Sequence, residues 1–289
     1  MIWGWLALGA VAAVPLGVLG YAGWRMGQPP AGSPAAFLAQ DSPRSGRPVL
    51  VCMGDSITQA GLGADWVGSL RLRLHDQATV VNAGIGGQLA WDLRQRLDEV
   101  QRCQPEAIVL LVGSNDAVGA LGGSWTSFYA SGRPQAPAED WFAEQYDALV
   151  GELVAMTPRL VCLTLPPLGE DLSAPAAAIV RRQNESIRTI ATARGVDLID
   201  LHPAFLSLRT GSSSDAGVPF MSGPLQFMRW AIASTIRHRV LGQSLDAIGK
   251  SRGLQTTVDT IHPNDRSESA MLELVEPWAH RALSLEKAP

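Results

Sequence analysis

The sequence is poor in cysteine and has no excess of positive charge. Its three cysteines, Cys52, Cys103 and Cys162, are widely spaced, which fits neither a disulfide framework nor a zinc site. Cys52 and Cys162 lie in apolar runs and are expected to be small buried hydrophobes, although the sequence leaves a bridge between them open. The net charge is −4 over 289 residues. A phosphate backbone needs a basic surface, so nucleic acid is not an expected partner.

Charge is also missing from the amino-terminal end, where no charged residue occurs from Ile2 to Trp24. A helix of this length reaches about 34 Å, enough to cross the hydrocarbon core of a bilayer. We therefore expect a transmembrane anchor at residues 1–25. A cleaved signal peptide, followed by secretion, is the rival reading, although the segment lacks a basic start and Gly20-Tyr21-Ala22 is a weak cleavage signal.

The segment after this span is rich in Gly, Pro, Ala and Ser and has little periodicity. We predict a flexible linker at residues 26–46 that joins the membrane anchor to the folded domain. The nearby side-chain cations are Arg25, Arg44 and Arg47, all after the span, and three charges over this distance leave the side of the membrane open.

From residue 47 onward, short apolar runs alternate with helical patterns. Strands are expected at about 48–53, 79–82, 107–112, 159–165 and 196–201, the clearest helices at 141–156 and 176–193, and a final helix at 268–283. This alternation predicts one domain at 47–289, an α/β fold in which a central five-stranded parallel sheet forms the middle of a three-layer α/β/α sandwich.

Two insertions interrupt the series. The first, near 119–138, carries Trp125, Phe128 and Tyr129 and follows the carboxyl end of a strand, so we expect it to form a pocket wall.

The second insertion, near 210–257, contains a helix predicted at 224–245. Met228, Ile232, Ile236 and Val240 recur in it at a spacing of four residues. Two interpretations remain open: ordinary packing on the domain, or a lid that lines an acyl pocket and touches a bilayer.

The most informative stretch runs from Val49 to Thr58, where five apolar residues end at Gly54-Asp55-Ser56. The apolar run predicts a buried parallel strand, and Gly54 is expected to let the backbone turn sharply at its end. Ser56 is the candidate nucleophile, but a serine hydroxyl needs a base to take its proton.

A base and an orienting acid occur about two hundred residues later, before the expected last helix. Asp259 and His262 lie three residues apart in Val258–Pro263, a spacing that suits a turn-held pair. We predict that Asp259 orients His262 and that His262 accepts the Ser56 proton.

Acyl transfer also needs hydrogen-bond donors for the oxyanion that forms on the attacked carbonyl. The glycine-rich turn that contains Gly84, Gly86 and Gly87 can present backbone N–H groups, and Asn115 offers a side-chain amide. Each signal is weak alone, because glycine-rich strand ends are common.

Together, residues 49–58, 81–87, 112–116 and 258–263 resemble, in order and spacing, the sequence blocks of the GDSL or SGNH hydrolases. These are serine esterases and lipases on a flavodoxin-like fold. By this resemblance, the nucleophile is Ser56, the oxyanion donors are Gly87 and Asn115, the base is His262 and the orienting acid is Asp259. Ile57 stands where the family name has Leu, a swap of similar volume. Gly84 and Gly86 remain alternatives to Gly87.

The sequence thus predicts a membrane-anchored GDSL-type esterase or lipase without metal or organic cofactor, acting on a lipid or an acylated carbohydrate. Two alternatives stay open: an acyltransferase or deacetylase acting on cell-envelope glycans, and a binding protein with a vestigial site. Asp200 and His202 form a second carboxylate and imidazole pair, but their spacing of two residues favours a structural role. The sequence does not indicate an oligomeric state.

Overall fold

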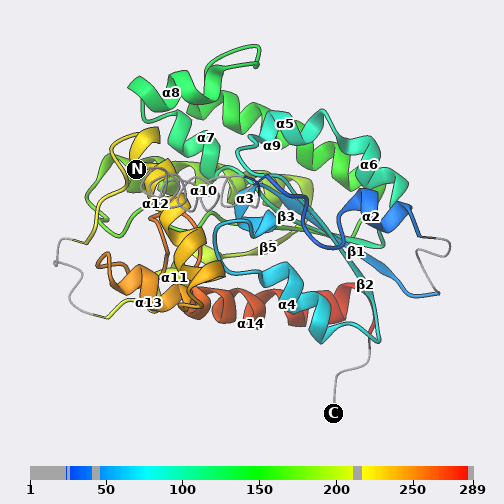
Figure 1. Cartoon of the computed structure of the whole chain (residues 1–289). Coiled ribbons are helices and arrows are strands. Elements are labelled where there is room, and N and C mark those ends of the chain that lie inside the picture. Colours follow the sequence, from blue (N-terminus) through cyan, green and yellow to red (C-terminus); the bar gives the residue numbers. More distant parts are fainter. Residues whose placement is uncertain (1–23, 25–26, 41–45, 211–216, 286–289) are drawn as a thin grey trace, which may run out of the picture.

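The computed structural model describes residues 24, 27–40, 46–210 and 217–285. Its centre is a parallel five-stranded sheet in the order β2-β1-β3-β4-β5 (Figure 1). The strands are β1 (Val49–Gly54), β2 (Thr79–Gly84), β3 (Ala107–Leu111), β4 (Leu160–Leu163) and β5 (Asp197–Ile199). The predicted parallel sheet is confirmed.

Helices cover both faces of this sheet, as Figure 1 shows. One face carries α4 (Trp66–Arg73), α11 (Leu201–Ser207) and α14 (Asp265–Ala282), and the other carries α5 (Ala90–Arg94), α9 (Glu139–Met156) and α10 (Pro175–Arg194). Because both faces are covered, the central strands β1 and β3 are fully apolar and buried. The three-layer arrangement follows from these runs.

Gly54 ends β1 for a reason that differs from the sequence-based one. Its φ lies outside the left-handed region, so the turn does not depend on the conformational freedom of glycine. A Cβ at this position would instead lie 2.3 Å from the Leu111 carbonyl oxygen and 2.3 Å from Thr58 Oγ1. Only a residue without a side chain lets β1 approach β3 and the next helix so closely.

The helix predicted at 224–245 ends earlier, at Val240, and its last turn is not α-helical. The α-helix α12 (Pro224–Thr235) continues as a π-helical turn, η1 (Ile236–Val240), and a separate helix α13 (Leu245–Lys250) follows. Ser234 and Thr235 each donate a hydroxyl hydrogen bond to the carbonyl four residues earlier, a pattern that bends helices. Gly242, at φ +66°, lies in the connection to α13.

The part of the predicted 26–46 linker that the structure describes packs against the domain. It contains the helix α2 (Pro34–Leu38), whose Phe37 is only 2% exposed. The Asn82 N–H donates to the Gly32 carbonyl, so this segment also covers the edge strand β2. A flexible linker is therefore the wrong interpretation for residues 27–40, because Phe37 and the open strand edge hold them in place.

The transmembrane segment expected at 1–25 lies outside the described residues, apart from Trp24. Among the helices of the described residues, none is both long and apolar enough to cross a membrane.

The three cysteines are free and buried. Cys52 on β1 pairs with Val109 on β3, and Leu110 on β3 pairs with Cys162 on β4. A whole strand therefore separates Cys52 from Cys162, which excludes the bridge that the sequence left open.

Candidate active site

The carboxyl ends of β1, β2 and β3 meet at one edge of the sheet, where open α/β folds bind ligands. Ser56 follows β1, Gly87 follows β2 and Asn115 follows β3. Three residues that the sequence singled out independently are thus brought to the same edge by the strand order.

Ser56 is the first residue of the short helix α3 (Ser56–Gln59) and is partly exposed. The preceding residue, Asp55, is buried, and its Oδ1 accepts a hydrogen bond from the Ile57 N–H at 2.9 Å. Asp55 therefore braces the turn that presents the Ser56 hydroxyl.

Asp259 and His262 lie in a tight turn closed by the Val258 N–H, which donates to the His262 carbonyl. Asp259 Oδ1 accepts the His262 N–H at 2.9 Å and the Ile261 N–H at 3.2 Å. The other oxygen, Oδ2, lies 2.8 Å from His262 Nδ1. His262 Nε2 in turn lies 2.9 Å from Ser56 Oγ. The residues predicted as nucleophile, base and orienting acid therefore form one continuous chain of contacts.

Burial and charge act in opposite directions on this pair. Burial alone disfavours the charged imidazole, but the adjacent Asp259 carboxylate outweighs it and raises the pKa of His262. Burial likewise disfavours the Asp259 carboxylate, but His262 and the two backbone N–H groups outweigh it and lower the pKa of Asp259. Asp259 thus remains an anion that accepts a hydrogen bond from Nδ1–H, which leaves Nε2 free to accept the Ser56 proton.

The glycine-rich turn after β2 separates its three candidate donors. The Gly84 N–H donates to Asn82 Oδ1, and the Gly86 N–H donates to Gln59 Oε1. Among the described residues, no acceptor is found for the N–H of Gly87, whose φ is +76°. Of the three glycines, Gly87 therefore fits the role of an oxyanion donor best.

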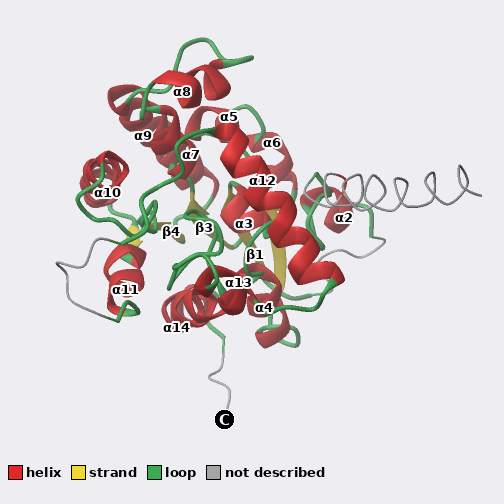
Figure 2. Ribbon diagram, turned by 60° about the vertical axis from the view of Figure 1, so that its left-hand side comes forward, coloured by secondary structure: helices red, strands yellow, loops and turns green. Residues whose placement is uncertain are grey.

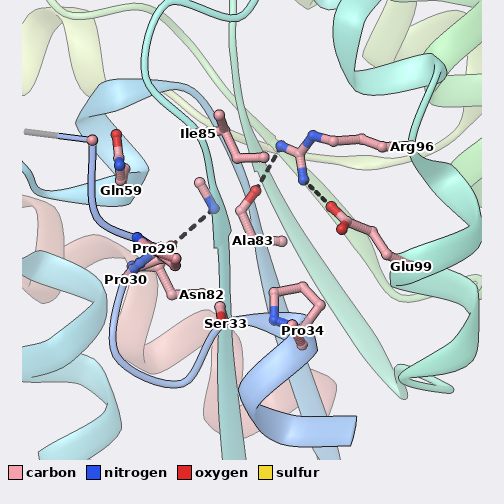
Figure 3. Close-up of a pocket in the computed structure, with 13 residues that line it drawn as sticks. Pro29, Pro30, Ser33, Pro34, Gln59, Asn82, Ala83, Ile85, Arg96 and Glu99 are labelled. Carbon is pink, nitrogen blue, oxygen red and sulfur yellow. Dashed lines mark hydrogen bonds and ion pairs between the residues drawn. The ribbon is translucent and has the colours of Figure 1, made fainter.

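Two arginines that the sequence reasoning missed hold this turn. Arg133 donates to the Gly87 carbonyl at 3.1 Å and pairs with Asp92. Arg96 donates to Gln88 Oε1 and to the Ala83 carbonyl, as Figure 3 shows for the latter. Their spacing carries no motif, so only the folded chain shows that they converge on one turn.

Asn115 lies at the start of α7 (Ser114–Gly119) and is 3% exposed. Its Nδ2 donates to the Gln88 carbonyl at 2.9 Å and approaches Asp55 Oδ2 at 3.4 Å. Its Oδ1 accepts a hydrogen bond from the Tyr129 hydroxyl at 2.6 Å. Tyr129 therefore fixes the orientation of the amide, with the NH₂ group on the side of Asp55 and the Gly87-Gln88 turn.

A pocket of about 230 Å³ lies behind the glycine-rich turn (Figure 3). Pro29, Pro30 and Pro34 form one wall, and Ala83 and Ile85 form part of the other. Gln59 joins the two walls, because its Nε2 donates to the Gln28 carbonyl while its Oε1 accepts from Gly86. Residues 27–35 thus support the turn from outside.

Aromatic residues from the two insertions meet above the site. The Phe227 ring lies 6.2 Å from the His262 ring, centroid to centroid, and Trp125 lies 6.4 Å from Phe227 and 5.5 Å from Phe220. Trp125 also lines a pocket of about 510 Å³ with Phe220. The first insertion therefore forms a pocket wall, as predicted, with Trp125 facing the pocket.

The second carboxylate and imidazole pair has other partners. Asp200 binds Thr164 Oγ1 and Arg188, and His202 Nδ1 lies 3.1 Å from the Leu165 carbonyl. Both residues stabilise the end of β4. Within the described ranges, no group of three potential metal-ligating side chains is found.

Comparison with known families identifies the GDSL-like lipase/acylhydrolase family over residues 52–219, more than half of the chain. This match includes Ser56, Gly87 and Asn115 but ends before Asp259 and His262, which are identified by their contacts. A comparison with curated proteins finds no significant match.

Several solved structures share the fold. An acetyl xylan esterase, AlAXEase, is 21% identical, with a TM-score of 0.52 over 80% of this chain and 98% of its own. A lipase/acylhydrolase from Enterococcus faecalis is 17% identical, with a TM-score of 0.54 over 83% of this chain and all of its own. A catalytic mutant of an acetylxylan esterase from Geobacillus stearothermophilus is 16% identical, with a TM-score of 0.53 over 84% of this chain and 97% of its own.

Two buried carboxyl groups lie beneath Ser56. Burial raises the pKa of Asp55 to about 6, against the opposing hydrogen bond from Ile57. Burial also raises the pKa of Asp116 to about 8, and the nearby Asp55 contributes in the same direction. Asp116 Oδ2 accepts the Ala90 N–H at 3.2 Å, a contact that a neutral side chain can also make.

Asp116→Asn tests the environment of this buried pair. The folded protein binds the Asp116 proton more tightly than the unfolded chain, so this group stabilises the fold least once the pH has risen to about 8. Asparagine cannot ionise. The free energy of unfolding of Asp116→Asn, measured relative to that of the parent protein by urea unfolding, should therefore rise by more than about 1 kcal/mol between about pH 5 and about pH 8. Asp98→Asn, at an exposed site, is the control. A pH-independent difference for Asp116→Asn would contradict this account.

Proposed function

The chain belongs to the GDSL-like lipase/acylhydrolase family, and from that premise we propose that it is a serine hydrolase that cleaves an acyl ester through a covalent intermediate on Ser56. The observation that carries the proposal is the contact of 2.9 Å between His262 Nε2 and Ser56 Oγ, with Asp259 2.8 Å from Nδ1 on the other side of the ring. This is the geometry that activates a serine hydroxyl.

The reaction has two halves. In the first, His262 takes the Ser56 proton as Oγ attacks the acyl carbonyl, and then gives that proton to the leaving alcohol. In the second, His262 takes a proton from the water that attacks the acyl group, and it returns that proton to Ser56 Oγ as the bond to the acyl group breaks and the acid leaves. Asp259 stabilises the imidazolium in both halves, while the Gly87 N–H, the Ser56 N–H and Asn115 Nδ2 stabilise the oxyanion.

For the substrate, acetyl groups on a carbohydrate are the first choice. Two of the structural neighbours are acetyl xylan esterases, although their identity of 16–21% supports the fold alone. Aromatic side chains near His262 offer flat apolar surfaces to a sugar ring or an acyl chain.

Replacing the nucleophile tests the proposal directly. Ser56→Ala should lower kcat on an aryl acetate and on acetylated xylo-oligosaccharides by about 10⁴-fold or more, because no other group can carry the acyl intermediate. Ser186→Ala, on the exposed side of α10, should leave kcat unchanged. Product analysis with an added sugar acceptor distinguishes hydrolysis from acyl transfer. Turnover by a folded Ser56→Ala protein close to that of the parent would refute the mechanism.

Asn115→Ala tests the oxyanion site. Losing one oxyanion donor typically lowers kcat by about 10²–10³-fold while substrate binding changes less. A urea unfolding curve checks that the variant is folded, since Asn115 also contacts Gln88 and Tyr129. The role assigned to this amide is wrong if a folded variant keeps kcat within about threefold of the parent value, because the loss of an oxyanion donor should lower kcat much more than that.

A further inference from the structure

The helix α12 packs Phe227 and Trp230 against the core of the domain but leaves other apolar side chains in solvent. Its buried positions are Ala231, Ser234 and Thr235, all small. Leu225 is 76% exposed and Met228 is 39% exposed. Phe227 and Trp230 account for the packing of α12 on its own domain, so the exposed Leu225 and Met228 are available to an external partner.

Exposed and half-buried residues form one continuous face along the helix. Positions 225, 228, 229, 232 and 236 repeat at three and four residues and therefore share one side of α12. The same surface continues past η1, where Val240 is 51% and Leu241 62% exposed. In Figure 2, α12 lies across the front of the molecule, with no other labelled element in front of it. The α12 outer face, as named here, comprises Leu225, Met228, Arg229, Ile232, Ile236, Arg237, Arg239, Val240 and Leu241.

This face carries positive charge that no carboxylate within the described ranges neutralises. The described structure pairs none of Arg229, Arg237 and Arg239 with a carboxylate, and Arg237 binds only the neutral side chains of Gln243 and Ser251. Seven other arginines each form an ion pair with Asp or Glu: Arg73, Arg94, Arg96, Arg133, Arg182, Arg188 and Arg194. Arg229 on α12 and Arg237 and Arg239 on η1 thus lie within eleven residues of each other without a carboxylate partner among the described residues.

The sequence around α12 is also free of acidic residues. No Asp or Glu occurs between Asp215 and Asp246, although the whole chain carries a net charge of −4. A long apolar stripe flanked by arginines, on an otherwise acidic protein, matches the chemistry of an anionic lipid surface: acyl chains beside negatively charged headgroups.

We propose that the α12 outer face is a docking surface for an anionic lipid bilayer. Exposed apolar residues enter the boundary between headgroups and acyl chains, and Arg229, Arg237 and Arg239 contact lipid phosphates. The opposite face of the same helix carries Phe227, whose ring lies 6.2 Å from that of His262. Docking would therefore hold the Ser56 and His262 site beside the lipid surface.

A fluorescent probe on Leu225 tests this proposal in the full chain. Because the three native cysteines are buried, a cysteine introduced by Leu225→Cys can be labelled selectively with an environment-sensitive dye. Leu72→Cys on α4 is the matched control, since Leu72 is 73% exposed and Leu225 is 76% exposed. The probe at 225 should shift to the blue, and nitroxide-labelled acyl chains should quench it, with phosphatidylglycerol vesicles but not with phosphatidylcholine vesicles. The probe at 72 should respond to neither.

Charge reversal provides the second arm of the test. We expect the triple variant Arg229→Glu, Arg237→Glu and Arg239→Glu to need about 100-fold more phosphatidylglycerol for the half-maximal change of the probe at position 225. Each arginine contributes roughly fivefold to the affinity for an anionic surface. The three residues lie outside the proposed catalytic machinery, so kcat on a soluble aryl acetate should not change. A failure of docking would therefore leave the hydrolase proposal standing.

Other outcomes would overturn the proposal. If the probe at 225 already shows blue-shifted emission without vesicles, at every protein concentration, another part of this chain covers the face. Protection that grows with protein concentration would indicate a second copy instead. Equal quenching in neutral and anionic vesicles, or equal exposure at positions 225 and 72 throughout, would also contradict it.

Discussion

The contact between the buried Asp259 carboxylate and His262 sets the requirements for the rest of the site. Asp259 is 0% exposed and His262 is 1% exposed, so neither charge has water to stabilise it. Isolated burial of either group would cost several kcal/mol. The turn from 258 to 263 offsets this cost with two backbone N–H groups on Asp259 and one direct contact between the side chains. The same closure aims His262 Nε2 at Ser56.

Ser56 and its surrounding donors depend on a second constraint, the close approach of strand ends. Gly54 lets β1 pass within contact distance of Leu111, which brings the turn after β1 next to the one after β3. Arg133 and Arg96 then hold the turn after β2 from its outer side. The Gly87 N–H is left without an internal acceptor among the described residues, which suits a donor reserved for a developing charge.

Much of this was predictable from the chain alone. Continuous apolar runs such as 107–111 predicted a parallel sheet, and small polar residues after them predicted its functional edge. Periodicity could not show which way the 224–245 helix faces, because an apolar stripe reads the same whether it is buried or exposed. Composition also misled at 27–40, where a sequence rich in Pro and Ala packs through Pro34, Phe37 and Leu38. The role of Arg133 could not be predicted, because its contacts with Gly87 and Asp92 join residues that are far apart in the sequence and form no local motif.

The claim on which the account rests is that His262 activates Ser56 within a preformed site. The most direct measurement is the reaction of the folded protein with a fluorophosphonate, followed by peptide mapping with mass spectrometry. The account predicts one phosphonyl adduct, on Ser56, and its loss when His262 is replaced by alanine in a protein that still folds. An unlabelled Ser56 in the folded parent protein, or labelling that persists at the same rate without His262, would contradict it.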